Sequence, residues 1–291
     1  MDGLLLQAII NGVLLGAIYV IASSGLSLVF GVMHVVNAAQ GDFVILGAFV
    51  AYWINYFTGV DPYILCPLVA VIFFVVGYLL HIGSVFRMIG RPALMSLILF
   101  FGLSTLLSNI ALLIWSPYGR IVTTPLSGAN LTIGPIAIPT QRLVSFIISL
   151  LFVYCIVFFL QKTKTGLAVR AASGNLGDVE AAMLVGVDIN KIYAFTLGLG
   201  TAAAGAAGAL ISPIFTFTPV SGSIYTLLAF AITVLGGLGY LHGTIIGGLL
   251  IGIVQSLIVT FYDVHYVYFV IFLLIYLVLV FRPKGLFGKG A

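Results

Sequence analysis

The sequence has very few charged residues. Only 6% of its 291 residues are Asp, Glu, Lys or Arg, and none of these lies between Ile192 and Tyr262. A soluble domain carries about 25% charged residues, and a charge at mid-membrane costs roughly 2.5–3.5 kcal/mol on insertion scales. With 62% hydrophobic residues and a mean hydropathy of +1.29, this scarcity of charge excludes a soluble globular fold and predicts an integral membrane protein.

Several functional classes also lack the residues that they would need. The two cysteines, Cys66 and Cys155, lie in apolar runs, where a small buried side chain is a better interpretation than a disulfide or metal ligand. The sequence contains no phosphate-binding G-x-x-x-x-G-K-[ST] loop, no metal-ligand spacing and no plausible catalytic triad. We therefore expect no enzyme, no metal and no other cofactor, and the sparse basic residues do not indicate a nucleic acid partner.

Apolar segments of membrane-spanning length follow one another along the chain. A helix that crosses a bilayer needs about 20 apolar residues, so the chain has room for about eight or nine spans in a single integral-membrane domain, residues 1–291. The predicted fold is an all-α, polytopic bundle of transmembrane helices. The expected spans are Leu4–Phe30, Phe43–Phe57, Tyr63–Ile82, Pro92–Trp115, Leu143–Leu160, Ile192–Ile211, Ile224–Leu235, Thr244–Phe261 and Tyr266–Phe281.

The basic residues predict how the bundle is oriented. Successive loops lie on alternate sides of the predicted membrane. Nine of the eleven Lys and Arg residues then share one side, and only Arg120 and Arg142 lie on the other. Those nine lie in the loop with Arg87 and Arg91, in the segment Lys162–Lys191 and in the tail Arg282–Lys289. The positive-inside rule makes their side cytoplasmic and places the N-terminus outside. If residues 32–41 instead enter the membrane and return, both the span count and the N-terminal side change.

The segment Lys162–Lys191 is the most charged part of the chain. We predict a short helix over 166–173 that Thr165 caps, and a second helix that Asn175 caps, with Asp178 favouring the dipole of its first turn. Two such short helices suit docking into a groove of a partner protein, but they equally suit resting on the membrane surface. The residues alone leave both interpretations open.

Polar residues inside or beside the spans are the candidates for a substrate path. The run HVVNAAQGD, His34–Asp42, places amides between the first two spans, where they either satisfy the backbone of a broken helix or line a path. Further polar side chains lie within spans, where hydrogen bonds between helices are their commoner role. The candidates for the path are Asn37, Gln40, Gly41, Asn109 and Gln255.

Four motifs in order along the chain resemble one family of transport proteins. They are SLVFGVMHVVNAAQGDFVILGAF (27–49), GLAVRAASGNLGDVEAAMLVGVD (166–188), AFAITVLGGLGYLHGTIIGGLLIG (229–252) and RPKGLFG (282–288). Together they resemble the branched-chain amino acid type of ABC transporter permease, and most closely its H-type subunit, the shorter of the two permeases. The resemblance covers nearly the whole chain.

This resemblance implies partners, a location and a mechanism. Permeases of this type pair with a homologous second permease subunit in the bacterial cytoplasmic (inner) membrane, where they also contact membrane lipid. Two cytoplasmic ATPase subunits drive them, and an external substrate-binding protein delivers the solute. The resemblance therefore implies alternating access for a branched-chain amino acid or a related small polar solute. A secondary transporter or facilitative channel without ATPase partners is the alternative, since some carriers coordinate ions with backbone carbonyls.

The resemblance also implies site residues. Asn37 and Gly41 match a motif near the path, although the family usually has His where Gln40 stands and a small residue where Tyr240 stands. Because relatives carry branched-chain amino acids, urea, short amides or aromatic acids, these two departures leave the substrate open. The residues that match the loop contacting an ATPase are Gly166, Arg170, Asp178, Glu180 and Gly186.

Overall fold

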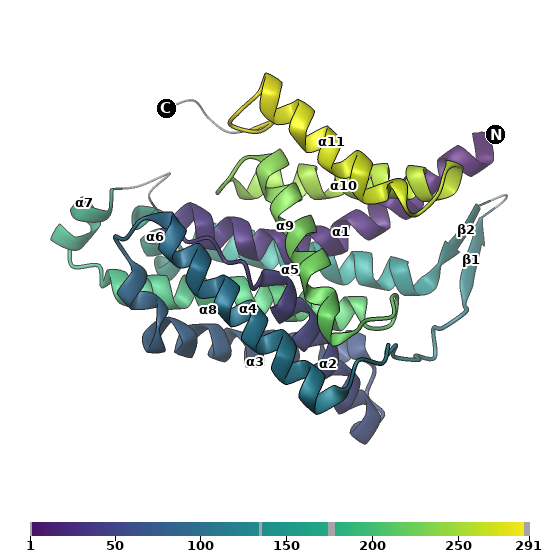
Figure 1. Cartoon of the computed structure of the whole chain (residues 1–291), viewed down its shortest axis with the longest axis horizontal. Helices are drawn as coiled ribbons and strands as arrows, with labels where there is room; N and C mark the ends of the chain where they lie inside the picture. The colour runs from purple at the N-terminus through teal and green to yellow at the C-terminus, as the bar shows by residue number, and fades with distance from the viewer. Residues whose placement is uncertain (1, 134–135, 174–177, 288–291) are drawn as a thin grey trace.

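The structure, a computed structural model, describes residues 2–133, 136–173 and 178–287. Most of its long helices lie side by side, roughly along the longest axis of the molecule (Figure 1). The helices are α1 (Asp2–Met33), α2 (Gln40–Thr58), α3 (Pro62–Gly83), η1 (Val85–Met88), α4 (Ala93–Trp115), α5 (Thr140–Lys162), α6 (Lys164–Ala171), α7 (Val179–Leu184), α8 (Ile189–Ile211), η2 (Pro219–Ser221), α9 (Gly222–Gly236), α10 (Leu241–Phe261) and α11 (Tyr266–Phe281). Two strands, β1 (Asn130–Ile133) and β2 (Ile136–Pro139), form an antiparallel hairpin.

The predicted all-α bundle is confirmed, with this hairpin as an addition. Among the described residues, seven helices are long and apolar enough to cross a membrane, and α11 is apolar but shorter. Each expected span coincides with a helix, and the helix ends differ from the expected ends by a few residues. The hairpin lies in the polar segment between α4 and α5, where Leu131 pairs with Ile138.

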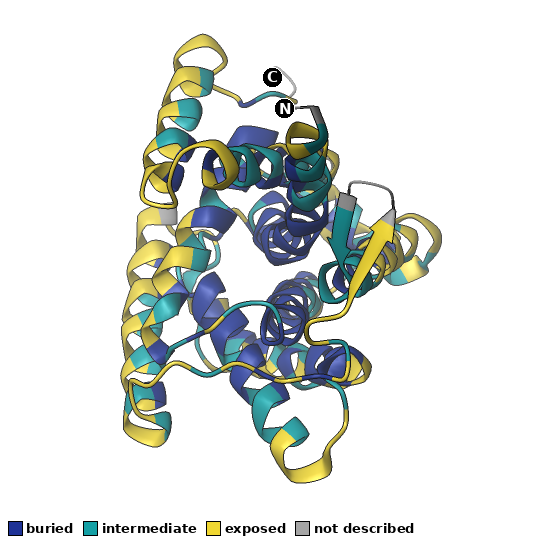
Figure 2. Cartoon of the chain, turned by 90° about the vertical axis from the view of Figure 1, so that its right-hand side faces the viewer, coloured by how far each residue is buried: buried dark blue, intermediate teal, exposed yellow. Residues whose placement is uncertain are grey.

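α8 is the central helix of the bundle. Of its membrane-length segment 89% is buried inside the molecule, against 11% for α4, which therefore lies at the periphery. α8 packs against α1, α2 and α3, and α1 packs in turn against α5, α9 and α10. Figure 2 shows the buried ribbon in the middle and exposed ribbon along the side on which α4 and α11 lie.

Small residues allow α8 and α2 to approach each other very closely. Gly and Ala fill most positions of α8 between Gly198 and Ala209. A Cβ atom at Gly208 would meet the carbonyl oxygen of Val44 and the amide nitrogen of Ala48 on α2. Since lipid tails are as apolar as side chains, such close backbone packing is a main source of helix association in a membrane.

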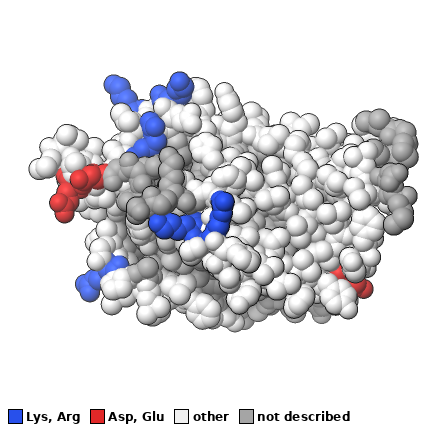
Figure 3. Space-filling view, turned by 90° about the horizontal axis from the view of Figure 1, so that it is seen from above, with Lys and Arg blue, Asp and Glu red and all other residues white. Residues whose placement is uncertain are grey.

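Most of the basic residues gather at one end of the molecule, which we term the basic end. There the hydroxyl of Ser173, just after α6, donates to the carbonyl of Gly31 near the end of α1 (2.7 Å). The amide of Leu286 in the tail donates to the carbonyl of Leu235 near the end of α9 (2.9 Å). In Figure 3 the visible Lys and Arg side chains lie toward this end. The hairpin marks the opposite end (Figure 1).

Candidate functional site

Two helices of the bundle begin inside it rather than at its surface. The side-chain amide of Gln40, the first residue of α2, donates to the carbonyls of Ala22 (2.8 Å) and Gly200 (3.4 Å). Gly200 lies halfway along α8, so α2 begins at the middle depth of the bundle. α9 begins beside it, because the Gly41 amide donates to the hydroxyl of Thr226 (2.9 Å). We term this meeting point, residues 37–42 and 222–226, the midplane junction.

Asn37 and Gln40 hold the interrupted backbone at this junction. The Asn37 side chain donates from Nδ2 to Oε1 of Gln40 (3.0 Å) and accepts from the amide of Ala39 at Oδ1 (3.1 Å). The hydroxyl of Thr226 donates to the carbonyl of Ala38 (3.2 Å). Both amide side chains are fully buried, so their polar atoms need hydrogen-bond partners inside the bundle. The structure thus brings Asn37, Gln40 and Gly41 together, and the amides do satisfy a broken helix.

The segment between α1 and α2 enters the bundle from the basic end and does not return to that end. α1 ends at the basic end, the linker reaches the middle depth, and α2 continues toward the opposite end. There the hydroxyl of Tyr63, at the start of α3, donates to the carbonyl of Gln141 at the start of α5 (3.2 Å). The linker and α2 together therefore make one crossing. α1 itself starts opposite the basic end, because the side-chain amide of Gln7 donates to the carbonyl of Ala137 in the hairpin (3.4 Å).

Asp42 is the polar residue at this junction that the sequence interpretation missed. The pattern assigned it to a polar connection, whereas the structure places it in the first turn of α2 with only 3% of its surface exposed. The Ser108 hydroxyl of α4 donates to its Oδ1 (2.7 Å), and its buried Oδ2 has no hydrogen-bond partner among the described residues. Within the same residues it is the only acid that the structure buries, so Asp42 does not lie in a polar connection between two spans as the pattern indicates.

The electrostatics of the junction explain why an acid is tolerated there. Helix N-termini carry a partial positive charge, and a carboxylate in the first turn of a helix stabilises it. Asp42 occupies that turn of α2 and also faces the first residue of α9, since a Cβ at Gly222 would meet its carboxylate. An acid directly before an uninterrupted apolar run is the signal that could have identified this helix start.

The other two candidates for the path lie apart from the junction. Asn109 is exposed on the outer face of α4, where its amide donates to the carbonyl of Thr105 in its own helix (2.7 Å). Gln255 lies half-buried on α10, and its Oε1 is buried without a hydrogen-bond partner among the described residues. Neither joins the group formed by Asn37 and Gln40.

The charged segment at the basic end forms two short helices, as predicted, but with other caps. Thr163, not Thr165, caps α6, because its hydroxyl accepts from the amide of Gly166 (2.9 Å). Asp178 caps α7 by accepting from the amides of Glu180 (2.9 Å) and Ala181 (3.2 Å). Asn175, the predicted cap, lies outside the described residues. A side-chain oxygen at the N-cap replaces the partner that the first amides of a helix lack.

Close packing and a tight turn account for two of the glycines of this segment, Gly166 and Gly186. A Cβ at Gly166 would meet the backbone of Phe159 and Leu160, so only glycine lets α6 lie directly against α5. Gly186 follows α7 with φ of 87°, a left-handed conformation that strains any residue with a Cβ.

The surface of α7 is unusually apolar for an exposed helix. Met183, Leu184 and Val185 are 54%, 89% and 80% exposed, and Glu180 is exposed beside them. Beyond the turn, the Lys191 ammonium lies 3.0 Å from the Asp188 carboxylate. That hydrogen-bonded pair lowers the pKa of Asp188, which also caps α8 through the amide of Lys191 (3.2 Å). α7 thus ends in an exposed apolar tip, residues 183–185, which is followed by the charged pair of Asp188 and Lys191.

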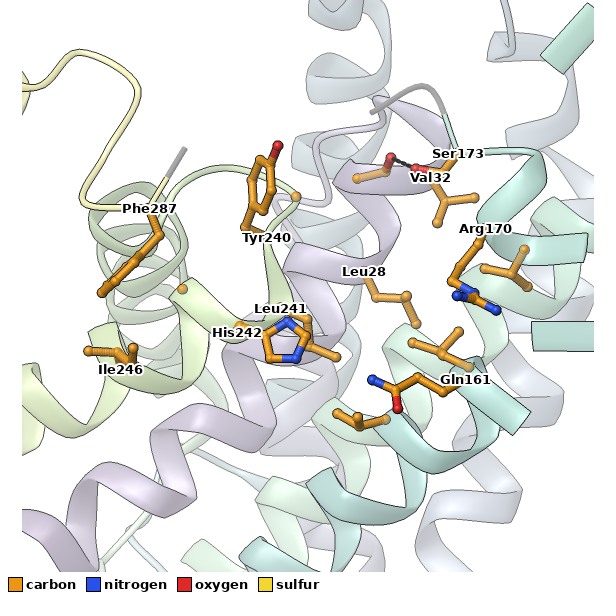
Figure 4. A pocket seen from close by; sticks show the side chains of 16 residues that line it. Leu28, Val32, Gln161, Arg170, Ser173, Tyr240, Leu241, His242, Ile246 and Phe287 are labelled. Carbon is orange, nitrogen blue, oxygen red and sulfur yellow. Dashed lines mark hydrogen bonds between the residues drawn. The ribbon is translucent and has the colours of Figure 1, made fainter. Parts of the chain in front are cut away.

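Arg170, the remaining residue matched to the loop, turns into a cavity rather than toward the tip of α7. The cavity measures about 480 Å³ and lies at the basic end, between α5, α6 and the start of α10, above the last turns of α1. In Figure 4, Arg170, Gln161 and His242 turn toward the same space, and Tyr240 points away from it. The other lining residues are Leu28, Gly31, Val32, Val157, Leu160, Val169, Ser173, Gly239, Leu241, Gly243, Ile246 and Phe287.

Metal chemistry finds no support in the side chains that the structure describes. No group of three or more His, Cys, Asp or Glu residues within the described ranges is arranged to hold a metal ion. Cys66 is buried and Cys155 is exposed, and both are free thiols.

The chain is similar to proteins of amino acid transport. The family model described as "Branched-chain amino acid transport system / permease component" matches residues 8–279. The high-affinity branched-chain amino acid transport system permease proteins BraD of Pseudomonas aeruginosa and LivH of Escherichia coli K12 are 28% and 29% identical to it, each over 98% of this chain and 96% of the relative. A probable branched-chain amino acid transport permease protein LivH of Methanocaldococcus jannaschii is 30% identical over 84% of this chain and 77% of its own length.

These matches agree with the seven apolar helices of spanning length and confirm a multi-pass membrane transport protein rather than an enzyme. No solved structure matches the chain significantly. The match covers both the midplane junction and the two short helices of the basic end, which the four motifs had pointed to. The chain belongs to the family of branched-chain amino acid transport system permeases.

Proposed function

We propose that the chain is the membrane-spanning permease subunit of an ABC importer in the bacterial cytoplasmic membrane, carrying branched-chain amino acids or a related small polar solute. The observation that supports this most strongly is the family match over residues 8–279, together with relatives that bear this function in their names. In this proposal the whole chain is one integral-membrane domain, and its basic end faces the cytoplasm.

The midplane junction is the proposed site of substrate recognition. A zwitterionic amino acid needs a partner for its ammonium and another for its carboxylate. Asp42 supplies a negative charge, and the starts of α2 and α9 supply the positive ends of two helix dipoles. Interrupted helices that meet near the midplane form such sites in several transporters. We include Asn37, Gln40 and Gly41 in this site, and Asn109 and Gln255 as more distant candidates along the path.

A second, homologous permease subunit would pack against the side of the molecule that carries α4. This helix is 11% buried over its membrane-length segment, yet its exposed face carries Thr105 and Asn109. Polar side chains are costly toward lipid and favourable against another helix or a water-filled path. The path in this proposal runs between the two subunits, close to Ser108 and Asp42 behind α4.

The two short helices of the basic end are the proposed contact with a cytoplasmic ATPase. The apolar tip of α7 would enter a groove of the ATPase, and Asp178, Glu180 and Gly186 fix the helix that carries it. Because Gly166 lets α6 pack closely against α5, a movement of the two short helices on the ATPase would be passed to α5. Two ATPases then drive alternating access, and an external binding protein delivers the substrate to the opposite end.

The test is transport by proteoliposomes of defined composition. We expect uptake of radiolabelled leucine only when this chain is reconstituted with its second permease subunit and both ATPases, with binding protein outside and ATP on the side of the basic end. A Walker-lysine variant of the ATPases is the control. Uptake by the chain alone, or uptake unaffected by ATP, would show a secondary transporter or facilitative channel instead.

A further inference from the structure

The cavity at the basic end takes no part in the proposed substrate path. It lies where α5 and α10 both pack on α1 but scarcely touch each other among the described residues, so α1 forms its floor. Its walls change polarity in a regular way. On α5, Gln161 lies one helical turn nearer the basic end than Val157, and on α10, His242 lies one turn nearer that end than Ile246.

This arrangement gives the cavity a polar mouth and an apolar interior along the axis that would be normal to the membrane. The mouth is at the depth where α1 and α5 end and where basic loops begin, which is the depth of lipid headgroups. The apolar part, with Leu28, Val157 and Ile246, lies at the depth of the first methylenes of acyl chains. A ligand that matches both parts is an amphiphile.

The charge at the mouth determines the sign of the headgroup. Arg170 is half-buried, and its Nε atom is buried without a hydrogen-bond partner among the described residues. No Asp or Glu is among the described residues that line the cavity. A buried Nε–H group without an acceptor is costly, so an anion with several acceptor oxygens at this guanidinium would stabilise it.

We propose that this cavity binds one anionic phospholipid of the adjacent leaflet, with its phosphate at Arg170 and its acyl chains over Leu28, Val157 and Ile246. A zwitterionic amino acid fits less well, because no carboxylate among the described lining residues would meet its ammonium. A free inorganic anion fits less well because it would leave the apolar floor without a partner. The bound lipid would bridge α6 to α10, and so would join the charged segment of the basic end to the bundle.

Native mass spectrometry of the purified full chain tests the proposal without any need for transport activity. The chain, released from detergent, is titrated with phosphatidylglycerol or phosphatidylcholine of equal chain length. Arg170→Gln removes the charge at the mouth of the cavity. Ile246→Trp fills the apolar interior of the cavity, and this position tolerates a larger side chain because Ile246 is 40% exposed. Lys164→Gln removes an exposed charge from the same helix, α6, outside the cavity.

The proposal expects the wild-type chain to retain phosphatidylglycerol in preference to phosphatidylcholine. Arg170→Gln should weaken this retention about fivefold, the effect of one cation beside an anionic headgroup. Ile246→Trp should weaken it as much without a change of charge, and Lys164→Gln should leave it unchanged. If Arg170→Gln does not fold, Ile246→Trp decides alone.

Three results would overturn it. Equal retention of the two lipids would show that the protein does not recognise the headgroup charge. Equal effects of Arg170→Gln and Lys164→Gln on retention would show that the lipid does not bind in the cavity. Displacement of the lipid by millimolar inorganic phosphate or leucine, with Ile246→Trp behaving as the wild type, would show a site for a small anion or for the amino acid instead.

Discussion

At the scale of single residues, Asp42 and Ser108 form the contact that joins α4 to the midplane junction. The Ser108 hydroxyl donates, at 2.7 Å, to a carboxylate that is otherwise buried. A hydrogen bond to a charged group contributes about 1.5–3 kcal/mol, and its loss leaves the buried acceptor unsatisfied. We expect Ser108→Ala to lower the free energy of unfolding by about that amount, measured by SDS titration in mixed micelles.

Thr105 of the same helix provides the matched control. Its exposed hydroxyl donates only to the carbonyl of Phe101 in its own helix (3.0 Å). Thr105→Ala should therefore change the stability by less than about 0.5 kcal/mol, as surface substitutions generally do. Equal stability losses in the two variants would contradict the assignment of Ser108 to Asp42.

Gly208 illustrates a residue whose lack of a side chain determines the helix spacing. A Cβ there would meet the backbone of Val44 and Ala48, and backbone moves far less easily than a side chain. We expect Gly208→Ala to destabilise the protein by about 1–3 kcal/mol through overpacking, seen as a lower thermal midpoint in detergent. Gly102→Ala is the control, because a Cβ added there would have no described neighbour within 4 Å. It should be neutral or slightly stabilising, since alanine favours a helix by about 1 kcal/mol.

At the scale of elements, α7 is built to be exposed and still apolar. Leu184, at its end, is 89% exposed. We expect Leu184→Asp to weaken co-purification of the ATPases at least about tenfold, because a charge replaces an apolar contact in the proposed groove. Leu131→Asp, at a 47% exposed position in the hairpin of the opposite end, is the control and should co-purify as the wild type does. Equal recovery of ATPase with both variants would argue against α7 as the contact.

The sequence predicted which segments become helices far better than it predicted which helix face points inward. In lipid the outer face is as apolar as the inner one, so the 3.6-residue period that identifies a buried stripe is lost. On α4 the pattern selects Asn109 as a candidate, whereas the structure places Ser108 against Asp42 and leaves Asn109 exposed. That Asn37 and Gln40 form hydrogen bonds close to their own positions in the chain was predictable, because buried amide groups need hydrogen-bond partners.

Helix starts were the other feature that pattern alone could not place. Thr163 and Thr165 are both good caps by residue type, and the structure assigns the cap to Thr163, whose hydroxyl accepts from the amide of Gly166. Asp42 follows a run of small and polar residues, a pattern that indicates a connection between two spans. Its position at a helix start depends on α9 meeting α2 there, a contact between segments far apart in the sequence.

At the scale of the whole molecule, the proposal depends on which side of the membrane the basic end faces. Ala129, before the hairpin, and Ala181, in α7, are both exposed and lie at opposite ends of the bundle. We expect Ala129→Cys, in a background where Cys155 is replaced by alanine, to react with a membrane-impermeant maleimide on intact cells. Ala181→Cys should react only after permeabilisation, and the buried Cys66 should stay unlabelled in both.

The reverse pattern would have a definite consequence for the mechanism. ATP and the ATPases are confined to the cytoplasm, so an α7 that is labelled from outside cannot contact them. The nine basic residues would then violate the positive-inside rule, and Arg120 and Arg142 would be the inner ones. Ala181 and Lys284 lie at the same end of the bundle, and α8, α9, α10 and α11 lie between them in the sequence, so the two sites must exchange sides together. A tag after Lys284 that became accessible from outside along with Ala181→Cys would therefore confirm the inverted bundle, whereas accessibility of one site without the other would contradict the crossings made by α8 to α11.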